Sequence, residues 1–297
     1  MSSLREVKDR IASVRSTLKI TSAMKLVASS KLRKAQRSIE ALRPYERTLA
    51  KILAALPPQM PDQVGHDGEW TVEESSKPTI VIAISSNTSM CGAFNANVIK
   101  KALDTVAGIE GPVEVWAFGR KMVDAFRKAG MPAARDYTHI VTHPASDEVA
   151  DISRELRSMY DSGQVERVIL VYNHFVSTGK QTPVAEGFLP FERGDFSASL
   201  EMTKGTSEMT GEDNLYILEP SAAQLAAAMI PQVLDLKLFA AILDSAAAEH
   251  AARMIAMQAA TDNAEELLSQ LTLEYNKGRQ QKITSEILDI VGGSAER

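Results

Sequence analysis

Residues 4–56 read LREVKDRIASVRSTLKITSAMKLVASSKLRKAQRSIEALRPYERTLAKILAAL. Alternate steps of three and four residues from Leu4 meet an apolar residue at 13 of 16 positions, the exceptions being Thr21, Lys25 and Glu46. This spacing is typical of the a/d seam of a coiled coil. One helix over the whole stretch spans about 80 Å at 1.5 Å per residue, so it needs a partner.

The partner is predicted at the other end of the chain. From Met229 to Tyr275 the same stepping gives 14 positions, of which only His250 and Thr261 are not apolar. We expect the two ends to wind round each other, the alternative being two ordinary helices of a bundle. Beyond Gly278 the apolar residues, Ile283 and Ile287 among them, leave this register, which predicts that the buried face rotates there.

Helix ends and bends are also encoded locally. Ser3 with Glu6 and Ser221 with Gln224 have the spacing of capping boxes. Two prolines interrupt the helical patterns: Pro44 is expected to bend the first helix without ending it, and Pro231 to kink or break the second. Gly292 and Gly293 are predicted to stop the C-terminal helix.

The middle of the chain has a different pattern, in which β-branched runs alternate with helical ones. Strands are predicted at 79–85, 113–119 and 167–175, with an edge strand at 183–190, and helices at 94–106, 120–129 and 148–162. This alternation indicates an α/β domain with a largely parallel sheet. Turn-rich stretches at 57–78 and 192–214 flank it, which predicts three parts: 1–56, 57–214 and 215–297.

Composition limits the class of protein. With 44% apolar and 24% charged residues in 297, the chain can bury a core. It has no apolar run long enough for a predicted membrane span and a single cysteine, Cys91. Residues 1–51 hold 13 basic and 4 acidic side chains, a net charge of +9 within a chain of net charge −5. Because no aromatic residue interleaves the basic ones, we expect acidic protein loops as their partner and not nucleic acid.

Candidate catalytic features are weak. The loop 85–92 follows the first predicted strand and precedes a helix, where α/β proteins bind phosphates, but it lacks the glycine spacing and the lysine of known phosphate loops. Cys91 at a helix start is interpreted as a packing residue more readily than as a nucleophile. His139 and His143 have the spacing of two metal ligands without an evident third. We therefore predict no active site, cofactor or metal.

Two motifs resemble one family. The first is Arg10-Ile11-x-Ser13-Val14-x-x-Thr17-x-Lys19-Ile20-Thr21-x-Ala23-Met24-Lys25, and the second is Tyr275-Asn276-Lys277-x-Arg279-Gln280-x-x-Ile283-Thr284-x-Glu286. They resemble the N- and C-terminal helices of the gamma subunit of F-type ATP synthases. One departure is visible in loop 85–92, where the family usually reads Ser-Asp-Arg-Gly-Leu-Cys-Gly: Asn87 to Met90 replace its middle, while Cys91 and Gly92 match.

The resemblance implies a long antiparallel coiled coil of the terminal helices with a central Rossmann-like α/β domain. It implies a non-catalytic rotor of a proton-translocating ATP synthase, which transmits torque between the c-ring and a hexameric ring of alpha and beta subunits. The epsilon subunit is a further partner, and the delta subunit is one only within the whole complex. The implied location is peripheral, on the cytoplasmic face of the bacterial plasma membrane. Residues implied in rotor–stator contact are Met24, Lys25, Arg253, Gln280, Thr284 and Glu286.

The seam interruption at Thr21 and Lys25 allows two interpretations. Ile20, Met24 and Val27 offer apolar groups on an adjacent face, which favours contact with a protein other than the coiled-coil partner. A polar residue that fixes helix register is the alternative. For the whole chain, the alternatives to a rotor are a coiled-coil scaffold with a ligand-binding α/β head and an α/β enzyme with a helical arm.

Overall fold

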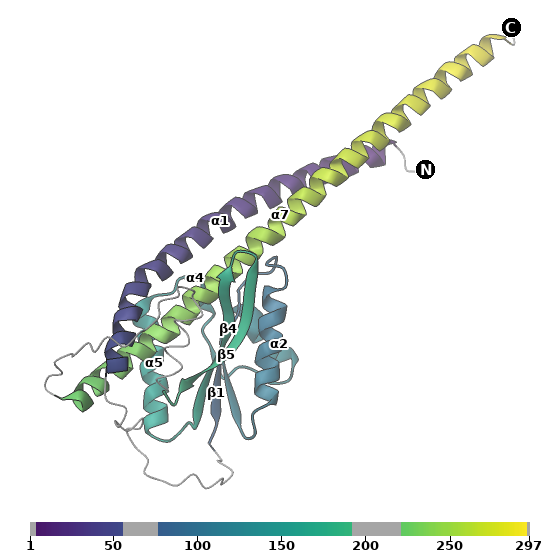
Figure 1. The fold of residues 1–297 in the computed structure, drawn as a ribbon. Coiled ribbons are helices and arrows are strands. Elements are labelled where there is room, and N and C mark those ends of the chain that lie inside the picture. The colour runs from purple at the N-terminus through teal and green to yellow at the C-terminus, as the bar shows by residue number, and fades with distance from the viewer. Residues whose placement is uncertain (1–3, 56–76, 192–220, 296–297) are drawn as a thin grey trace. The chain divides into compact units, whose positions relative to one another are not determined.

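The computed structural model describes residues 4–55, 77–191 and 221–295 (Figure 1). Two helices dominate it: α1 covers Leu4–Ala55 and α7 covers Ala222–Ala295. The chain divides into a terminal unit, Met1–Ser29 with Arg253–Arg297, and a central unit, Ser30–Ala252. Each long helix contributes to both units and runs without interruption through its proline, Pro44 or Pro231.

The terminal unit is an antiparallel pair of helices. Leu4 of α1 lies against Gly278 of α7, where an added Cβ would stand 3.1 Å from the leucine Cδ2. Thr21 contacts Thr261, with the two hydroxyl oxygens 3.0 Å apart. From Leu4 to Thr21 the chain advances by seventeen residues, and from Gly278 back to Thr261 it also spans seventeen. The two helices are therefore antiparallel and keep the same register between these two contacts. The antiparallel coiled coil is confirmed.

The predicted seam is the buried one. In the terminal unit its most buried apolar members are Val7, Ala28, Met257, Ala264 and Leu271. None of the seam positions that the structure describes is exposed. A side-chain period of three and four residues therefore selects the buried face here, as it does in coiled coils generally.

The central unit contains a five-stranded sheet in the order β3-β2-β1-β4-β5. The strands are β1 (Thr79–Ile84), β2 (Val113–Phe118), β3 (Arg135–Asp136), β4 (Arg167–Ser177) and β5 (Lys180–Leu189). The first four are parallel, and β5 returns antiparallel beside β4 at the edge. The predicted α/β fold is confirmed, and the sequence pattern missed only the two-residue strand β3 among the described strands.

Helices cover both faces of the sheet (Figure 1). On one face lie α2 (Phe94–Ala107) and α3 (Arg120–Lys128), and on the other α4 (Thr138–Thr142), α5 (Ser146–Asp161) and α7. Strand β1 is buried on both faces. Ile80, Ile82 and Ile84 belong to the hydrophobic core between the sheet and helices α5 and α7, whereas Val81 and Ala83 belong to the core between the sheet and α2. A parallel strand between two helical layers requires such an uninterrupted apolar run.

Within the central unit, α1 also packs on α7. Leu49 and Leu53 are buried against Met229, Val233 and Leu236, all of them predicted seam positions. The Tyr45 hydroxyl donates a hydrogen bond to Gln232 Oε1 at 3.1 Å on the same side. The seam therefore continues past Pro44, as predicted.

The helix ends differ in part from the predictions. The backbone N–H of Gln224 donates to Ser221 Oγ at 3.3 Å, which confirms the cap of α7. The predicted stop at Gly292 and Gly293 is wrong, because α7 continues to Ala295. A helical glycine costs about 1 kcal/mol relative to alanine, which weakens a helix without ending it. Ser3, Leu56 and most of the two predicted linkers lie outside the described residues.

Helix α7 is apolar enough over one stretch within Gln224–Leu288 to cross a membrane by length and composition alone. Half of that stretch is buried inside the protein. Buried alanines and leucines of α7, such as Leu234, Leu238 and Ala248, pack in the core of the central unit. Core packing therefore accounts for much of its apolar character.

Candidate functional site

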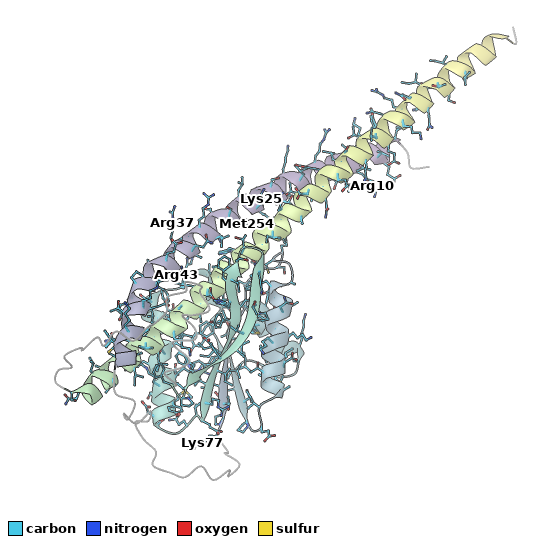
Figure 2. All side chains as sticks on the ribbon, viewed as in Figure 1. Arg10, Lys25, Arg37, Arg43, Lys77 and Met254 are labelled. Atoms are coloured by element: carbon cyan, nitrogen blue, oxygen red, sulfur yellow. The ribbon has the colours of Figure 1, made fainter. Side chains whose placement is uncertain are left out.

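All six residues that the resemblance implied lie in the terminal unit. Met24 and Lys25 of α1 and Arg253 of α7 are half-buried, whereas Gln280, Thr284 and Glu286 of α7 are exposed. Figure 2 marks Lys25 on α1 and Met254, the neighbour of Arg253, on α7.

The exposed members make only local contacts among the hydrogen bonds and ion pairs described for them. The Thr284 hydroxyl donates to the Gln280 carbonyl at 2.9 Å, one helical turn back. Glu286 lies 3.8 Å from Lys282, and both side chains are more than half exposed. Exposed pairs of this kind contribute little to stability. These side chains are thus available for a partner protein.

Large apolar side chains on the outside of the terminal unit form its most informative surface. Of the 13 exposed large hydrophobic residues in the described part of the chain, nine belong to this unit. On α1 they are Ile20, Leu26 and Val27, the last two 70% and 57% exposed. On α7 they are Ile255, Leu267, Leu273, Ile283, Ile287 and Leu288. Neighbouring exposed apolar side chains, such as Ile283 and Ile287 one helical turn apart, favour contact with another protein.

Two predictions from the sequence concern apolar residues on this surface. The face of Ile20 and Val27 was predicted to be available for another protein, and both side chains are exposed. The prediction of a rotated buried face at Ile283 and Ile287 is wrong, since residues 281–288 are all exposed. The described part of α1 begins at Leu4, opposite Gly278, so it does not extend beside these residues.

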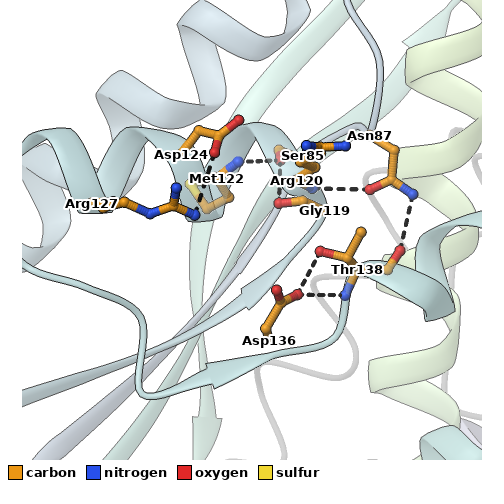
Figure 3. Close-up of polar contacts among 9 residues, drawn as sticks. All are labelled: Ser85, Asn87, Gly119, Arg120, Met122, Asp124, Arg127, Asp136 and Thr138. Carbon is orange, nitrogen blue, oxygen red and sulfur yellow. Dashed lines mark hydrogen bonds and ion pairs between the residues drawn. The ribbon is translucent and has the colours of Figure 1, made fainter.

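In the central unit, the loop 85–92 is tied to its own domain (Figure 3). Ser85 Oγ accepts a hydrogen bond from the Met122 backbone N–H at 2.9 Å. Gly119 has φ +102°, and a Cβ there would stand 2.3 Å from the Ser85 carbonyl oxygen. Only glycine therefore fits at position 119, because the backbone after β2 passes directly against the backbone after β1.

Asn87 connects the same loop to two helices. Its Oδ1 accepts from the Arg120 backbone N–H at 2.9 Å, at the start of α3. Its Nδ2 donates to the Thr138 carbonyl and to Thr142 Oγ1, both at 2.9 Å, in α4. This position belongs to the stretch that departs from the usual family loop. The amide uses both its donor and acceptor ends, which a carboxylate cannot do.

Cys91 is a packing residue. It is 1% exposed and lies in a cluster with Phe94, Ala248 and Ala252, against which Phe175 also packs. Its sulfur accepts a hydrogen bond from Asn95 Nδ2 at 3.1 Å. These side chains occupy the carboxyl ends of β1 and β4, where strand order reverses and α/β proteins bind ligands. The interpretation of Cys91 as a packing residue fits this environment.

His139 and His143 have the spacing of two metal ligands, although no metal site was predicted there. His139 Nε2 contacts Glu148 Oε1, and both side chains are substantially exposed. His143 is exposed and follows the end of α4. In residues 4–55, 77–191 and 221–295, no three His, Cys, Asp or Glu side chains come together in a way that could hold a metal.

A buried polar cluster in the central unit was missed by the sequence reasoning. His174 Nδ1 lies 2.5 Å from Asp244 Oδ2, with side-chain exposures of 7% and 16%. Burial raises the pKa of Glu46, with a further rise from Asp244 and an opposing effect of Arg43. Burial likewise raises the pKa of Tyr172, and Glu186 and Asp244 add to that rise. In the sequence these residues stand in four separate segments, so no local pattern brings them together.

Comparison with known proteins matches the whole chain. A family model described as ATP synthase matches residues 3–295. The ATP synthase gamma chain of Bacteroides fragilis is 47% identical over 303 residues, with 99% of each chain covered. That of Bacteroides thetaiotaomicron is 46% identical with both chains covered completely, and that of Flavobacterium johnsoniae is 41% identical, with 99% of this chain and 98% of the relative covered.

Solved structures show the same fold. The rotor of the Euglena gracilis mitochondrial ATP synthase has a TM-score of 0.65 at 21% identity and covers 94% of this chain and 98% of its own. The central stalk and c-ring structure of the Tetrahymena thermophila mitochondrial ATP synthase contains a chain with a TM-score of 0.57 at 20% identity, covering 81% and 99%. Full-length identity above 40% to named gamma chains, together with the family model, confirms the resemblance carried by the two terminal motifs. The chain therefore belongs to the ATP synthase gamma-chain family, as a subunit of that complex and not an enzyme by itself.

Proposed function

We propose that this chain, the central-stalk rotor of its ATP synthase, uses the terminal unit as the surface that turns inside a hexameric ring of alpha and beta subunits. The observation that carries the proposal is the concentration of nine exposed large apolar side chains on this unit. An isolated coiled coil has no use for such a surface, because exposed apolar groups favour association. Polar neighbours such as Gln280 and Glu286 give the same surface directional contacts.

The terminal unit is also asymmetric, which a rotor requires. Ile20, Leu26 and Val27 are exposed on α1, and Leu273 and Leu288 on α7, at different heights along the pair. A ring of three identical catalytic sites that meets such a surface is contacted differently at each site. Differential contact energy between rotary states is what couples rotation to the conformations of those sites.

The six site residues are part of this proposal. Lys25 and Arg253 carry positive charges at half-buried positions and suit acidic or carbonyl groups of the ring. Met24 beside Lys25 has a flexible, polarizable side chain that can adapt to several neighbours in succession. Gln280, Thr284 and Glu286 lie in the exposed stretch 279–288 of α7 and supply polar contacts there.

The remaining partners and the location complete the proposal. The central unit is the part available to the epsilon subunit and the c-ring, and the delta subunit joins only in the whole complex. In the proposed division, residues 1–56 and 215–297 contain the two helices of the shaft, and residues 57–214 contain the α/β head. The complex is peripheral on the cytoplasmic face of the bacterial plasma membrane. Family membership favours this function over a coiled-coil scaffold or an enzyme with a helical arm.

A substitution on the exposed apolar face tests the proposal. Val27→Asp places a charge at a side chain that is 57% exposed in the free chain, so the free chain is expected to fold normally. If Val27 faces the ring, the charge is desolvated on assembly, and the variant recovers less alpha/beta hexamer and less ATP hydrolysis. Ser16→Asp, at an exposed polar position of the same helix, is the matched control. Equal hexamer recovery with both variants overturns the assignment of this face.

A further inference from the structure

Within the central unit, α7 presents three charged side chains to three different elements. Asp235 Oδ1 accepts from Arg157 Nη2 of α5 at 3.1 Å. Lys237 Nζ donates to the Gly187 carbonyl of β5 at 2.7 Å. Asp244 Oδ2 lies 2.5 Å from His174 Nδ1 and accepts from the Phe175 backbone N–H of β4 at 3.2 Å.

These contacts are removed from water to different degrees. Lys237 is 5% exposed, and the side chains of Arg157 and Asp235 are 16% and 29% exposed. The most buried pair is His174 with Asp244. Charged hydrogen bonds in such surroundings are stronger and more orientation-dependent than those on the surface. Their loss also leaves a buried group without its partner.

The rest of this contact is apolar. Leu234, Leu238, Ala241 and Ile242 of α7 are buried in the core shared with the sheet and α5. Apolar burial is non-directional and opposes rolling or sliding of a helix only weakly compared with a hydrogen bond of fixed geometry. Three charged contacts to separate elements along one helix fix both its rotation about its own axis and its position along that axis.

Asp244 is the centre of this arrangement. Its carboxylate joins two consecutive residues of β4, and its charge also acts on Glu46 of α1 and on Tyr172 of β4. Asp244 of α7 is therefore bound to two consecutive residues of strand β4. A contact of fixed geometry between the helix and the sheet is suited to transmit a twisting force between them.

We propose that Asp244, supported by Asp235 and Lys237, is a positioning residue that locks the sheet to α7 against rotation, so that torque passes between them without slip. The inference rests on the proposed rotor function. Under it, a chain that lacks the lock still assembles and still hydrolyses ATP, but it pumps fewer protons for each ATP when rotation is opposed by a proton-motive force. If Asp244 only stabilises the fold, the number of protons pumped per ATP is expected to fall in every variant in proportion to its loss of thermal stability.

The experiment uses membrane vesicles that contain the assembled ATP synthase, with hydrolysis and proton pumping measured in the same vesicles. Asp244→Leu removes the directional contact. Leu238→Ala opens a cavity at a fully buried position of the same helix and lowers stability without removing a charged contact. Asp151→Leu makes the same exchange in the exposed pair of Asp151 with Arg154.

The expected result is a loss of pumping per ATP hydrolysed in Asp244→Leu, with an unchanged ratio in Leu238→Ala even where its melting temperature falls as far. An unchanged ratio in Asp244→Leu, or an equal loss in both variants, overturns the proposal. If Asp244→Leu does not assemble, Lys237→Met decides in the same assay: it keeps the aliphatic stem and loses the bond to Gly187, and an unchanged ratio again overturns the lock. Failure of the rotor function itself is separate, because wild-type vesicles would then show no coupled pumping.

Discussion

The Thr261 hydroxyl donates a hydrogen bond to Thr21 Oγ1 at 3.0 Å across the two helices of the terminal unit, and each residue is 8% exposed. Thr21 in turn contacts the Leu18 carbonyl at 3.1 Å. Both threonines occupy seam positions, Thr21 next to Leu18 and Thr261 between Met257 and Ala264. Each hydroxyl also has a carbonyl partner in its own helix, which for Thr261 is that of Met257 at 2.8 Å, so the bond between the two threonines adds to the register that the apolar seam sets. Of the two interpretations of the interrupted seam, the bond to Thr261 favours a role of Thr21 in register, and the exposed side chains of Ile20 and Val27 favour a protein contact beside it.

Replacing Thr21 by valine tests this pair. Thr21→Val leaves the Thr261 hydroxyl without its partner across the helices and is expected to destabilise the chain by about 1 kcal/mol. The double variant Thr21→Val with Thr261→Val is expected to recover that loss, because both partners then become apolar. Thermal unfolding followed by circular dichroism measures it, with Thr17→Val at an exposed position as control. A double variant no more stable than the single one contradicts a direct coupling of the two hydroxyls.

Burial in the seam predicts a large position dependence of charge substitutions along α7. Leu243 is 5% exposed and Leu273 is 68% exposed, although both are leucines of the same helix. Leu243→Asp buries an unpaired carboxylate and is expected to cost about 3 kcal/mol or more, which prevents assembly. Leu273→Asp is the matched control and is expected to leave the free chain folded. Similar urea midpoints for the two variants would contradict the packing of Leu243.

Asn87 offers a test of the loop that departs from the family pattern. Asn87→Asp keeps the acceptor for the Arg120 N–H but loses both donations to α4, and it sets a carboxylate against the Thr138 carbonyl. The expected loss of stability is roughly 1–3 kcal/mol. Asn97→Asp, at an exposed position of α2, makes the same exchange as a control. Chemical denaturation of the two variants measures the difference, and equal midpoints would show that the amide donations do not matter.

The sequence predicted most of the fold because its strongest signals are periodic. Both seams follow from apolar spacing, three buried strands from apolar β-branched runs and the edge strand from the prolines that flank it, and the described seam positions are not exposed. Strand β3 was missed, since Arg135 and Asp136 are two exposed residues with no apolar pattern. The cluster of His174 with Asp244 was missed for a different reason: seventy residues separate the partners, and only the folded sheet brings them together. Ile283 and Ile287 were misassigned because periodicity shows which residues share a face and not where the partner helix ends.

Glu46 predicts a pH dependence of stability with a definite sign. Burial holds its pKa in the folded chain above the ordinary value of 4.5, and Asp244 adds to that rise. Proton binding therefore favours the folded state: the stabilising contribution is complete below pH 4.5 and is lost as pH rises through the folded-state pKa. Glu46→Gln removes the ionisation, so its stability relative to wild type is expected to increase across that interval and to level off above it.

Urea denaturation at a series of pH values measures this difference, with Glu40→Gln at an exposed position of the same helix as control. Because Glu46 occupies a seam position in the central unit, its ionisation acts directly on the packing of α1. A stability difference between Glu46→Gln and wild type that does not change with pH, or that falls as pH rises, would show that burial does not raise the pKa of the Glu46 carboxyl.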